Sequence, residues 1–208
     1  MIKAIIFDIG GVLIDVDIEY DKKMYHELLG FSGIDDLLDP CHQRGIYSDL
    51  EEGKIGADEF RRYILSHSRP GSTPDDVDRC VAALLKEMPP YKAELLTELS
   101  RHYEVCILSN NNEISIKYCH DIFTRAGLDW QKVISREYLS FKMKLLKPDP
   151  RIYTAVLRDI GLPPEEILFI DDAADNVQVA SEMGIRAVLF GSGQDLRDVV
   201  RKALEEMD

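Results

Sequence analysis

Short apolar runs that end in polar or glycine residues recur along the chain. The clearest runs cover residues 2–7, 104–108, 167–170 and 185–190, and a weaker one covers residues 132–134. The runs are rich in β-branched side chains and are shorter than typical helices, which is typical of buried strands. Between them, apolar residues recur at three- and four-residue spacing over 92–102, 114–126, 151–160 and 176–183, which predicts helices.

Strands that alternate with helices from about residue 90 onward predict a doubly wound α/β fold, with a parallel sheet covered on both faces. Residues 18–87 differ, because they contain helical stretches at 18–29, 57–66 and 74–87 and no convincing strand. We therefore expect an α/β core formed by residues 1–17 and 88–208. A helical cap of residues 18–87 is inserted after the first strand.

Composition narrows the classes of function. The chain has 208 residues, 45% hydrophobic and 30% charged, and a formal net charge of −13. Such a charge repels nucleic acid and anionic membranes, so we expect neither as a partner. Four cysteines without a C-x-x-C pair argue against a zinc site, and no signal peptide is evident, so we expect reduced thiols in the cytoplasm. The absence of a long apolar surface helix favours a monomer or a weak dimer.

Polar side chains follow the predicted strands where each strand ends. These candidates, with one lysine before a later helix, are Asp8, Ser109, Asn110, Lys147, Asp171 and Asp172. Each alone is typical of a turn or a helix cap, but ligands bind beyond the carboxyl ends of strands in open α/β sheets. Carboxylates suit Mg²⁺, and a hydroxyl, helix N–H groups and a lysine suit a phosphate. The combination predicts a site for a divalent cation and a phosphate ester.

Four ordered segments resemble the haloacid dehalogenase superfamily. They are FDIGGVLID (7–15), ILSNNN (107–112), LKPDPRIY (146–153) and FIDDAADN (169–176). The resemblance covers nearly the whole chain and includes an inserted helical cap. The first segment looks most like the branch that contains bacterial α-glucose-1-phosphate phosphatases. The resemblance implies a Mg²⁺-dependent hydrolase of a small phosphorylated metabolite, such as the sugar phosphate glucose 1-phosphate.

The resemblance also implies roles for individual residues. Asp8 would be the nucleophile that forms an aspartyl-phosphate, which water then hydrolyses. Mg²⁺ would be held by Asp8, the Gly10 carbonyl and Asp172. Asp171 and Asn176 would bind the metal directly, through water, or support its ligands.

The phosphoryl oxygens would be held by Ser109, the Asn110 backbone and Lys147. Relatives often have a glycine three residues before this lysine, where the chain has Lys144. Either lysine is therefore a candidate to reach the phosphate, and the Lys-Pro pair favours Lys147.

The chain departs from the family pattern at Gly10, where related phosphatases usually have an aspartate that acts as general acid. Loss of a positioned acid typically lowers the rate by about 10² to 10⁴ for a poor leaving group. Three explanations are open. Asp15 or a cap residue could replace the acid. The substrate could be a sugar 1-phosphate, whose sugar leaves without strong assistance, or the chain could be a weak or inactive relative. Asp15 has a second interpretation as a hinge to the cap.

Two alternatives remain open from the sequence. A dehalogenase of this fold also uses the first aspartate and often lacks the second, but it needs no metal and gives Asp171 and Asp172 no purpose. A non-catalytic relative would bind a phosphorylated ligand or a protein, and the missing acid favours this class. Intact Asp8, Ser109 and Lys147 weigh against it.

Overall fold

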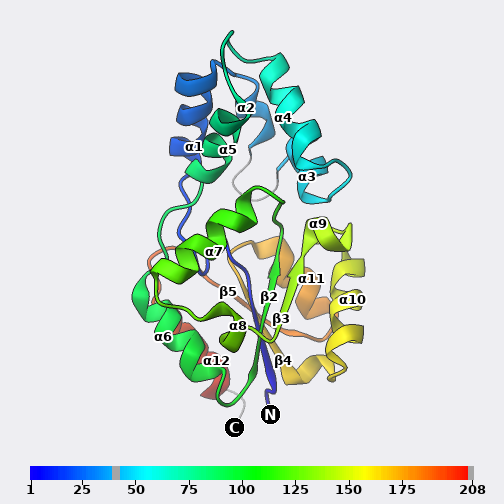
Figure 1. Cartoon of the computed structure of the whole chain (residues 1–208). Helices are drawn as coiled ribbons and strands as arrows, with labels where there is room; N and C mark the ends of the chain where they lie inside the picture. Colours follow the sequence, from blue (N-terminus) through cyan, green and yellow to red (C-terminus); the bar gives the residue numbers. More distant parts are fainter. Residues whose placement is uncertain (39–42, 206–208) are drawn as a thin grey trace.

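A computed structural model describes residues 1–38 and 43–205 of the chain (Figure 1). Its centre is a sheet of five parallel strands in the order β3-β2-β1-β4-β5. The strands are β1 (Ala4–Phe7), β2 (Glu104–Ser109), β3 (Arg136–Leu139), β4 (Ile167–Asp171) and β5 (Arg186–Leu189). This sheet confirms the doubly wound α/β fold predicted from the sequence.

Strand register aligns the chemically important ends. The first strand lies in the middle of the sheet, and Phe7 pairs with Ile107 of β2 on one side and with Ile170 of β4 on the other. Strands β2 and β4 end shortly after these positions, so all three strands end at the same edge of the sheet. The Asp8 amide still donates to the Ile170 carbonyl at 3.0 Å, which fixes the start of the loop after β1.

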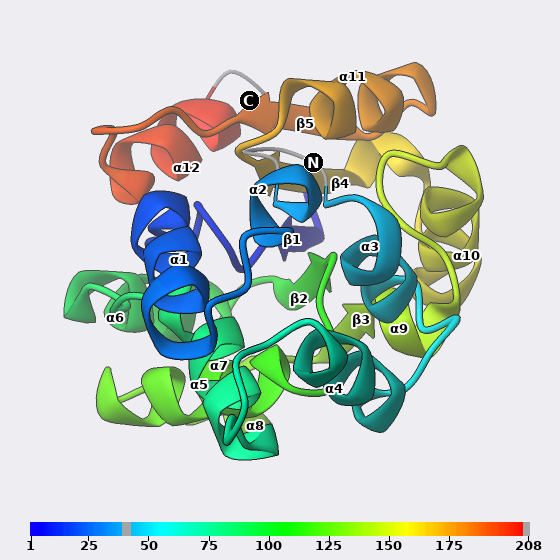
Figure 2. The ribbon, with the colours of Figure 1, turned by 90° about the horizontal axis from the view of Figure 1, so that it is seen from above.

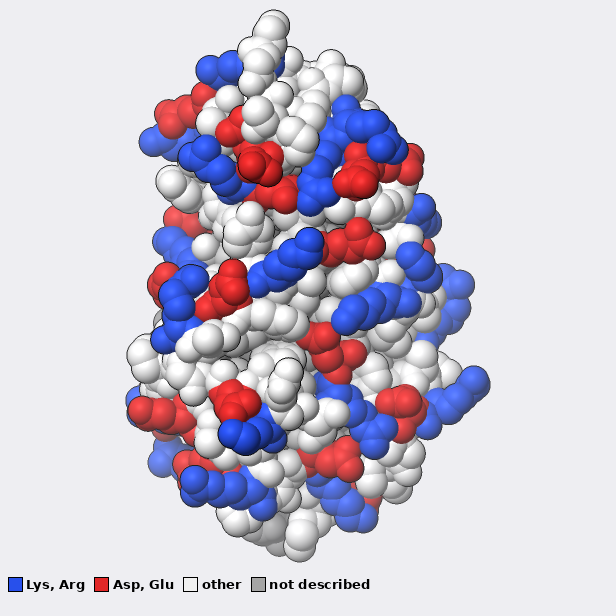
Figure 3. Space-filling view, in the orientation of Figure 1, with Lys and Arg blue, Asp and Glu red and all other residues white. Residues whose placement is uncertain are grey.

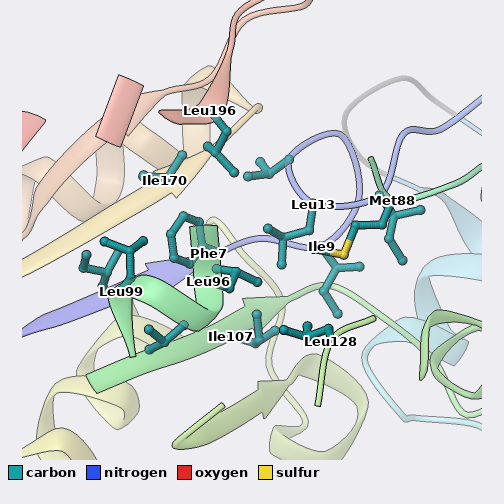
Figure 4. Packing of buried hydrophobic residues seen from close by; sticks show 14 of the residues in the cluster. Phe7, Ile9, Leu13, Met88, Leu96, Leu99, Ile107, Leu128, Ile170 and Leu196 are labelled. Carbon is teal, nitrogen blue, oxygen red and sulfur yellow. The ribbon is translucent and has the colours of Figure 1, made fainter. Parts of the chain in front are cut away.

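Helices cover both faces of this sheet because successive strand side chains point to opposite faces. On one face, Ile5 and Phe7 pack with residues of α6 (Pro90–Leu99), α7 (Ser115–Arg125) and α12 (Leu196–Glu205). Figure 4 shows this packing around Phe7. On the other face, Ala4 and Ile6 pack with α10 (Pro150–Ile160) and α11 (Ala174–Glu182). Short helical turns complete the core: α8 (Trp130–Val133), α9 (Ser140–Met143) and the 3₁₀ turn Pro164–Glu166.

The prediction of a strand at 132–134 is wrong. These residues belong to the helical turn α8 and its end, and the strand follows at Arg136–Leu139. This edge strand pairs only with β2, and Arg136 and Glu137 are partly exposed on it. Polar residues are tolerated at such an edge, so no apolar run marks the strand. Helix α12, which packs Leu196 and Val200 into the core, was also not identified from the sequence.

Residues between β1 and α6 form helices beyond the carboxyl end of the sheet (Figures 1 and 2). They are α1 (Ile18–Met24), the π-helical turn Tyr25–Leu29, α2 (Ile34–Leu37), α3 (Gly45–Glu51), α4 (Ala57–Ser66) and α5 (Pro74–Ala83). These helices have their own cluster of buried residues, which includes Tyr25, Tyr47 and Phe60 and adds Ile114 from the core. We propose that residues 18–87 form a cap domain on this basis.

Two chain segments connect the cap to the core, and they lie side by side. The first leaves the core at residues 15–17 and the second returns at 84–87. Val16 forms a β-bridge with Leu85, and the Asp17 amide donates to the Leu84 carbonyl at 2.9 Å. The Asp15 amide donates to the Glu87 carbonyl at 3.3 Å. Asp15 therefore lies at the junction between cap and core.

Surface properties agree with the composition. Figure 3 shows acidic and basic side chains interspersed over one face, with no large patch of a single sign on that face. Cys80, Cys106 and Cys119 are free thiols and are buried. Among the described helices, none has the length and apolar character needed to cross a bilayer.

The cap contains a buried carboxyl group, Asp21, which lowers the free energy of unfolding at neutral pH. Asp21 of α1 is 0% exposed, and neither of its carboxylate oxygens has a hydrogen-bond partner in the described part of the chain. Burial raises the pKa of Asp21 from 3.8 to about 8. Its titratable neighbours are Tyr25, Tyr47 and Cys80, and burial raises their pKa values as well, so they stay neutral around pH 7. Asp21 is therefore protonated in the folded protein at pH 7 and ionised in the unfolded chain.

Asp21→Asn is expected to stabilise the protein at alkaline pH. Because the unfolded chain loses the Asp21 proton above pH 4 and the folded protein keeps it until about pH 8, wild-type stability falls by about 1.4 kcal/mol per pH unit in this window. The substitution removes this loss, so its benefit should grow from pH 5 to pH 8 and reach several kcal/mol. Urea denaturation at pH 5, 6.5 and 8 measures it. Asp36→Asn, an exposed change in α2, is the control, and an equal pH dependence in both variants would contradict the prediction.

Candidate active site

Asp8 follows β1 directly and is 8% exposed. A tight loop carries the chain away from it, with the Gly11 amide donating to the Ile14 carbonyl at 2.9 Å. The Lys147 ammonium lies 3.0 Å from Asp8 Oδ1. The structure brings these two residues together, although most of the chain separates them in the sequence.

Asp171 organises the floor of the site. It is 0% exposed, and its Oδ2 atom lies 2.6 Å from Lys147 Nζ, which also donates to the Leu108 carbonyl at 3.0 Å. Its Oδ1 atom accepts from the Ala173 amide and from Asn176 Nδ2, both at 2.9 Å. Both carboxylate oxygens are therefore engaged, and Asp171 holds Lys147 and Asn176 in place.

Three carboxylates converge at this point. One oxygen from each of Asp8, Asp171 and Asp172 lies within 4.8 Å of the others. Asn176 Oδ1 is buried and has no hydrogen-bond partner in the described part of the chain. Hard oxygen atoms at this spacing, with one buried acceptor left over, fit a divalent cation such as Mg²⁺. Asp8 and Asp172 have carboxylate oxygens that can bind a cation, whereas neighbouring protein groups already engage both oxygens of Asp171.

The electrostatics of the cluster favour an added positive charge. The pKa of Asp8 is raised to about 7, because burial and the charges of Asp171 and Asp172 together outweigh the lowering effect of Lys147. Burial and then Asp171 raise the pKa of Asp172 to about 6. For Lys147, burial lowers the pKa, but Asp171 and Asp8 outweigh this effect and hold it above its usual value. Lys147 alone does not neutralise three neighbouring acids.

The two glycines after Asp8 have different steric surroundings. A Cβ atom on Gly11, whose φ is +73°, would lie 1.9 Å from Asp172 Oδ2. A Cβ atom on Gly10 would meet only Val16 Cγ1 at 3.5 Å, an ordinary contact. Gly11 thus makes room for the Asp172 carboxylate, a role that sequence analysis missed. The second glycine of the Gly10-Gly11 pair was the feature of the sequence that could have indicated this role.

The residues at the end of β2 line the same cavity as Asp8 and Lys147. Ser109 is 2% exposed, and its hydroxyl lies within 3.3 Å of the Asn110 carbonyl. The Asn110 side chain donates to the Lys147 carbonyl at 3.0 Å and accepts from the Lys147 amide at 2.9 Å. Asn110 therefore fixes the backbone that carries the lysine, a contact that the sequence did not predict.

The structure brings Lys147, and not Lys144, to Asp8. Lys144 has φ of +59°, in the left-handed region that favours glycine, and its ammonium donates to the Gly53 carbonyl in the cap. Glycine adopts this conformation more readily than lysine does. The preference for Lys147 from the Lys-Pro pair agrees with this geometry.

Asp15 does not reach the cavity that contains Asp8. Its side chain is 57% exposed, and its Oδ1 atom accepts from Lys92 Nζ at 3.1 Å. It lines a neighbouring cavity on the other side of Asp172. The interpretation of Asp15 as a replacement proton donor is not supported by this position, whereas a hinge role fits its place at the cap junction.

The cavity over Asp8 has a volume of about 120 Å³ and lies between core and cap. Core residues Asp8, Ser109, Lys147 and Asp172 line one side, and Glu51 from α3 lines the cap side. Sequence analysis did not identify Glu51. It had no local signal, because an acidic residue at the end of a cap helix is ordinary.

Comparison with known proteins places the chain in a family. Residues 2–184 match the model of the haloacid dehalogenase-like hydrolases. D-ribitol-5-phosphate phosphatase of Bacteroides thetaiotaomicron is 32% identical over 198 residues, which cover 95% of this chain and 96% of that protein. A phosphatase of phosphorylated carbohydrates from Thermotoga maritima is 24% identical, and the alignment covers 94% of this chain and 88% of that protein.

A solved structure agrees closely in fold. A haloacid dehalogenase family enzyme from Bacteroides thetaiotaomicron, in complex with magnesium and inorganic phosphate, superposes with a TM-score of 0.91 and 33% identity. The alignment covers 97% of this chain and 100% of that one. The family match, the sequence relative and this structure each cover most of the chain. The chain belongs to the haloacid dehalogenase-like hydrolases.

Proposed function

We propose that the chain is a Mg²⁺-dependent phosphatase that hydrolyses a small phosphorylated sugar or sugar alcohol through an aspartyl-phosphate on Asp8. The observation that carries the proposal is the convergence of Asp8, Lys147 and Asp172 on one small cavity. A nucleophilic carboxylate, a fixed cation and a cluster of acids are the parts that phosphoryl transfer needs. The phosphatase class predicted from the sequence agrees with the relatives named above.

Asp8 acts as the nucleophile in this proposal. Its carboxylate attacks phosphorus, the ester oxygen leaves, and water then attacks the phosphorus of the aspartyl-phosphate to release inorganic phosphate. Lys147 and the Ser109 hydroxyl contact the phosphoryl oxygens, and the Asn110 backbone adds a donor. Since Asp171 and Asn110 both fix Lys147, its charge is in place before substrate binds.

Mg²⁺ would be held by Asp8, the Gly10 carbonyl and Asp172. Asn176, whose Oδ1 atom is buried without a partner, would bind it through water or support its ligands, and Asp171 would hold the surrounding groups. When bound, the cation supplies positive charge that offsets the negative charge of the phosphoryl group and of the acidic cluster. The magnesium and phosphate in the related Bacteroides structure support this assignment.

The substrate class follows from the cavity and the named relatives. A cavity of about 120 Å³ with a cap over it suits a phosphoryl group and the adjoining part of a small metabolite. Two relatives are named for ribitol 5-phosphate and for phosphorylated carbohydrates. We therefore propose a sugar or sugar-alcohol phosphate, with glucose 1-phosphate as one candidate. Action in the cytoplasm, as a monomer or weak dimer, is part of the same proposal.

The dehalogenase alternative is less well supported. Haloacid dehalogenases share the fold, as the Xanthobacter autotrophicus enzyme does with a TM-score of 0.62 at 18% identity. Their chemistry gives no role to the acid pair at 171 and 172, which here joins Asp8 in one cluster. A non-catalytic binding protein would not need the nucleophile and Lys147 in contact.

The test is product release from a panel of compounds with Mg²⁺ and with EDTA. The panel contains ribitol 5-phosphate, glucose 1-phosphate, glucose 6-phosphate, p-nitrophenyl phosphate and 2-chloropropionate. We expect phosphate release that falls at least about 100-fold in EDTA and returns when Mg²⁺ is added back. Chloride release that EDTA does not affect would favour the dehalogenase, and no release from any compound would favour a binding protein.

A further inference from the structure

The cavity over Asp8 contains one acid that the proposed mechanism does not yet use. Glu51 is the last residue of α3, is 9% exposed, and lines this cavity from the cap side. It shares this cavity with Asp8, Ser109 and Lys147. A carboxyl group in the same small cavity as a nucleophile can reach an atom of a substrate bound there.

The backbone around Glu51 is fixed to the core. The Ser140 hydroxyl, which is fully buried, donates to the Glu51 carbonyl at 2.6 Å and accepts from the Asn111 amide at 2.9 Å. Two residues later, the Gly53 carbonyl accepts from the Lys144 ammonium. A Cβ atom on Gly53 would lie 2.2 Å from the Phe141 carbonyl oxygen, so cap and core backbones are in close contact here.

These contacts between cap and core hold the backbone at Glu51 in a fixed position. The Ser140 bond joins residues 89 positions apart, and Ser140 is the first residue of the short helix α9 in the core. A further bond from the Ala57 amide to Glu113 Oε2, at 3.1 Å, ties the start of α4 to the core. Position is the first requirement for a proton donor.

The site lacks the acid that related phosphatases have two residues after the nucleophile. Gly10 stands there, and its surroundings would accept a Cβ atom, so sterics do not explain the glycine. Asp15 lies outside the cavity and pairs with Lys92. Among the described carboxylates that line this cavity, Asp8 and Asp172 are the nucleophile and a metal ligand in the proposed function. Glu51 is the remaining one of these described residues.

We propose that Glu51 is the general acid and base of this enzyme and replaces the aspartate missing at position 10. This inference rests on the proposed function. In the first step Asp8 attacks phosphorus, the bond between phosphorus and the leaving oxygen breaks, and the Glu51 proton passes to that oxygen. In the second step the Glu51 carboxylate takes a proton from the water that attacks the aspartyl-phosphate. Glu51 thus returns to its protonated form, and one water is consumed per ester.

The environment of Glu51 favours the protonated form that the first step needs. The pKa of Glu51 is raised from 4.5 to about 8, because burial and then the charge of Asp8 raise it more than the charge of Lys147 lowers it. A phosphate dianion in the cavity would add negative charge nearby and act in the same direction as Asp8.

The experiment compares leaving groups. Glu51→Gln keeps the shape of the side chain and removes the proton, and Glu52→Gln is the matched control, because Glu52 is the next residue but pairs with Lys54 outside this cavity. Phosphate release with Mg²⁺ is measured for p-nitrophenyl phosphate, phenyl phosphate, glucose 6-phosphate and ribitol 5-phosphate. We expect Glu51→Gln to lose about 10² to 10⁴ in kcat/KM on the alkyl esters and less than about 10-fold on p-nitrophenyl phosphate. Glu52→Gln should follow the wild type.

An equal loss on all four esters would overturn the proposal, because a purely structural or substrate-binding residue does not respond to the leaving group. If Glu51→Gln does not fold, as judged by its thermal denaturation, the wild-type enzyme decides. A shallow dependence of kcat/KM on leaving-group basicity supports an acid in the site, and a steep one overturns it. Absence of all wild-type turnover would instead overturn the proposed function, and this inference with it.

Discussion

Asp8→Asn is expected to abolish phosphate release, with a loss on the order of 10⁴-fold or more. The amide has the shape of the carboxylate but is a far weaker nucleophile, so no aspartyl-phosphate forms at a useful rate. Lys147 keeps Asp171 at 2.6 Å, and burial already raises the pKa of Asp8 to about 7, so a neutral side chain at position 8 is tolerated. We therefore expect the variant to fold with wild-type thermal stability.

The measurement is kcat/KM on p-nitrophenyl phosphate, which needs little help from a proton donor and so isolates the nucleophile. Asp15→Asn is the matched control, because this aspartate follows the same strand but is 57% exposed and lies outside the cavity. It should change activity only a few-fold. Comparable losses in the two variants would argue that Asp8 has no special role, and a loss confined to Asp15→Asn would contradict the assignment of Asp8 as the nucleophile.

Gly11→Ala is expected to lower activity by about 10²-fold and to raise the Mg²⁺ concentration needed for half-maximal rate. The added methyl would lie 1.9 Å from Asp172 Oδ2, so the carboxylate must move away from the cluster that it forms with Asp8. The φ of +73° adds a backbone cost of about 1 kcal/mol for alanine. Activity and stability should therefore both decrease.

Gly127→Ala separates these two effects. Gly127 has φ of +85°, and a Cβ atom there would meet nothing within 4 Å. It should show the backbone cost in thermal denaturation without any change in Mg²⁺ dependence. Identical Mg²⁺ titrations of the two variants would contradict the role assigned to Gly11. The comparison therefore tests the crowding of Asp172 independently of strain.

Much of the candidate active site was predictable from the sequence. Strands of a parallel sheet run in one direction, so polar residues that follow buried strands must gather at one edge. That rule predicted Asp8, Ser109 and Asp171 at one place, and the register of the strands puts them there. Lys147, a candidate because it precedes a predicted helix, lies 3.0 Å from Asp8. Edge strand β3 was misplaced because it is short and partly polar.

What the sequence by itself determined was therefore the fold class, the inserted helical region and the residues at strand ends, since these depend on local periodicity and on the direction of strands. Only the tertiary structure decided which of Lys144 and Lys147 meets Asp8, and that Asp15 turns to Lys92 instead. It also decided that Gly11 makes room for Asp172 and that Glu51 faces the cavity. These features depend on contacts between segments far apart in the chain, such as Ser140 with Glu51, and no local pattern encodes such a contact.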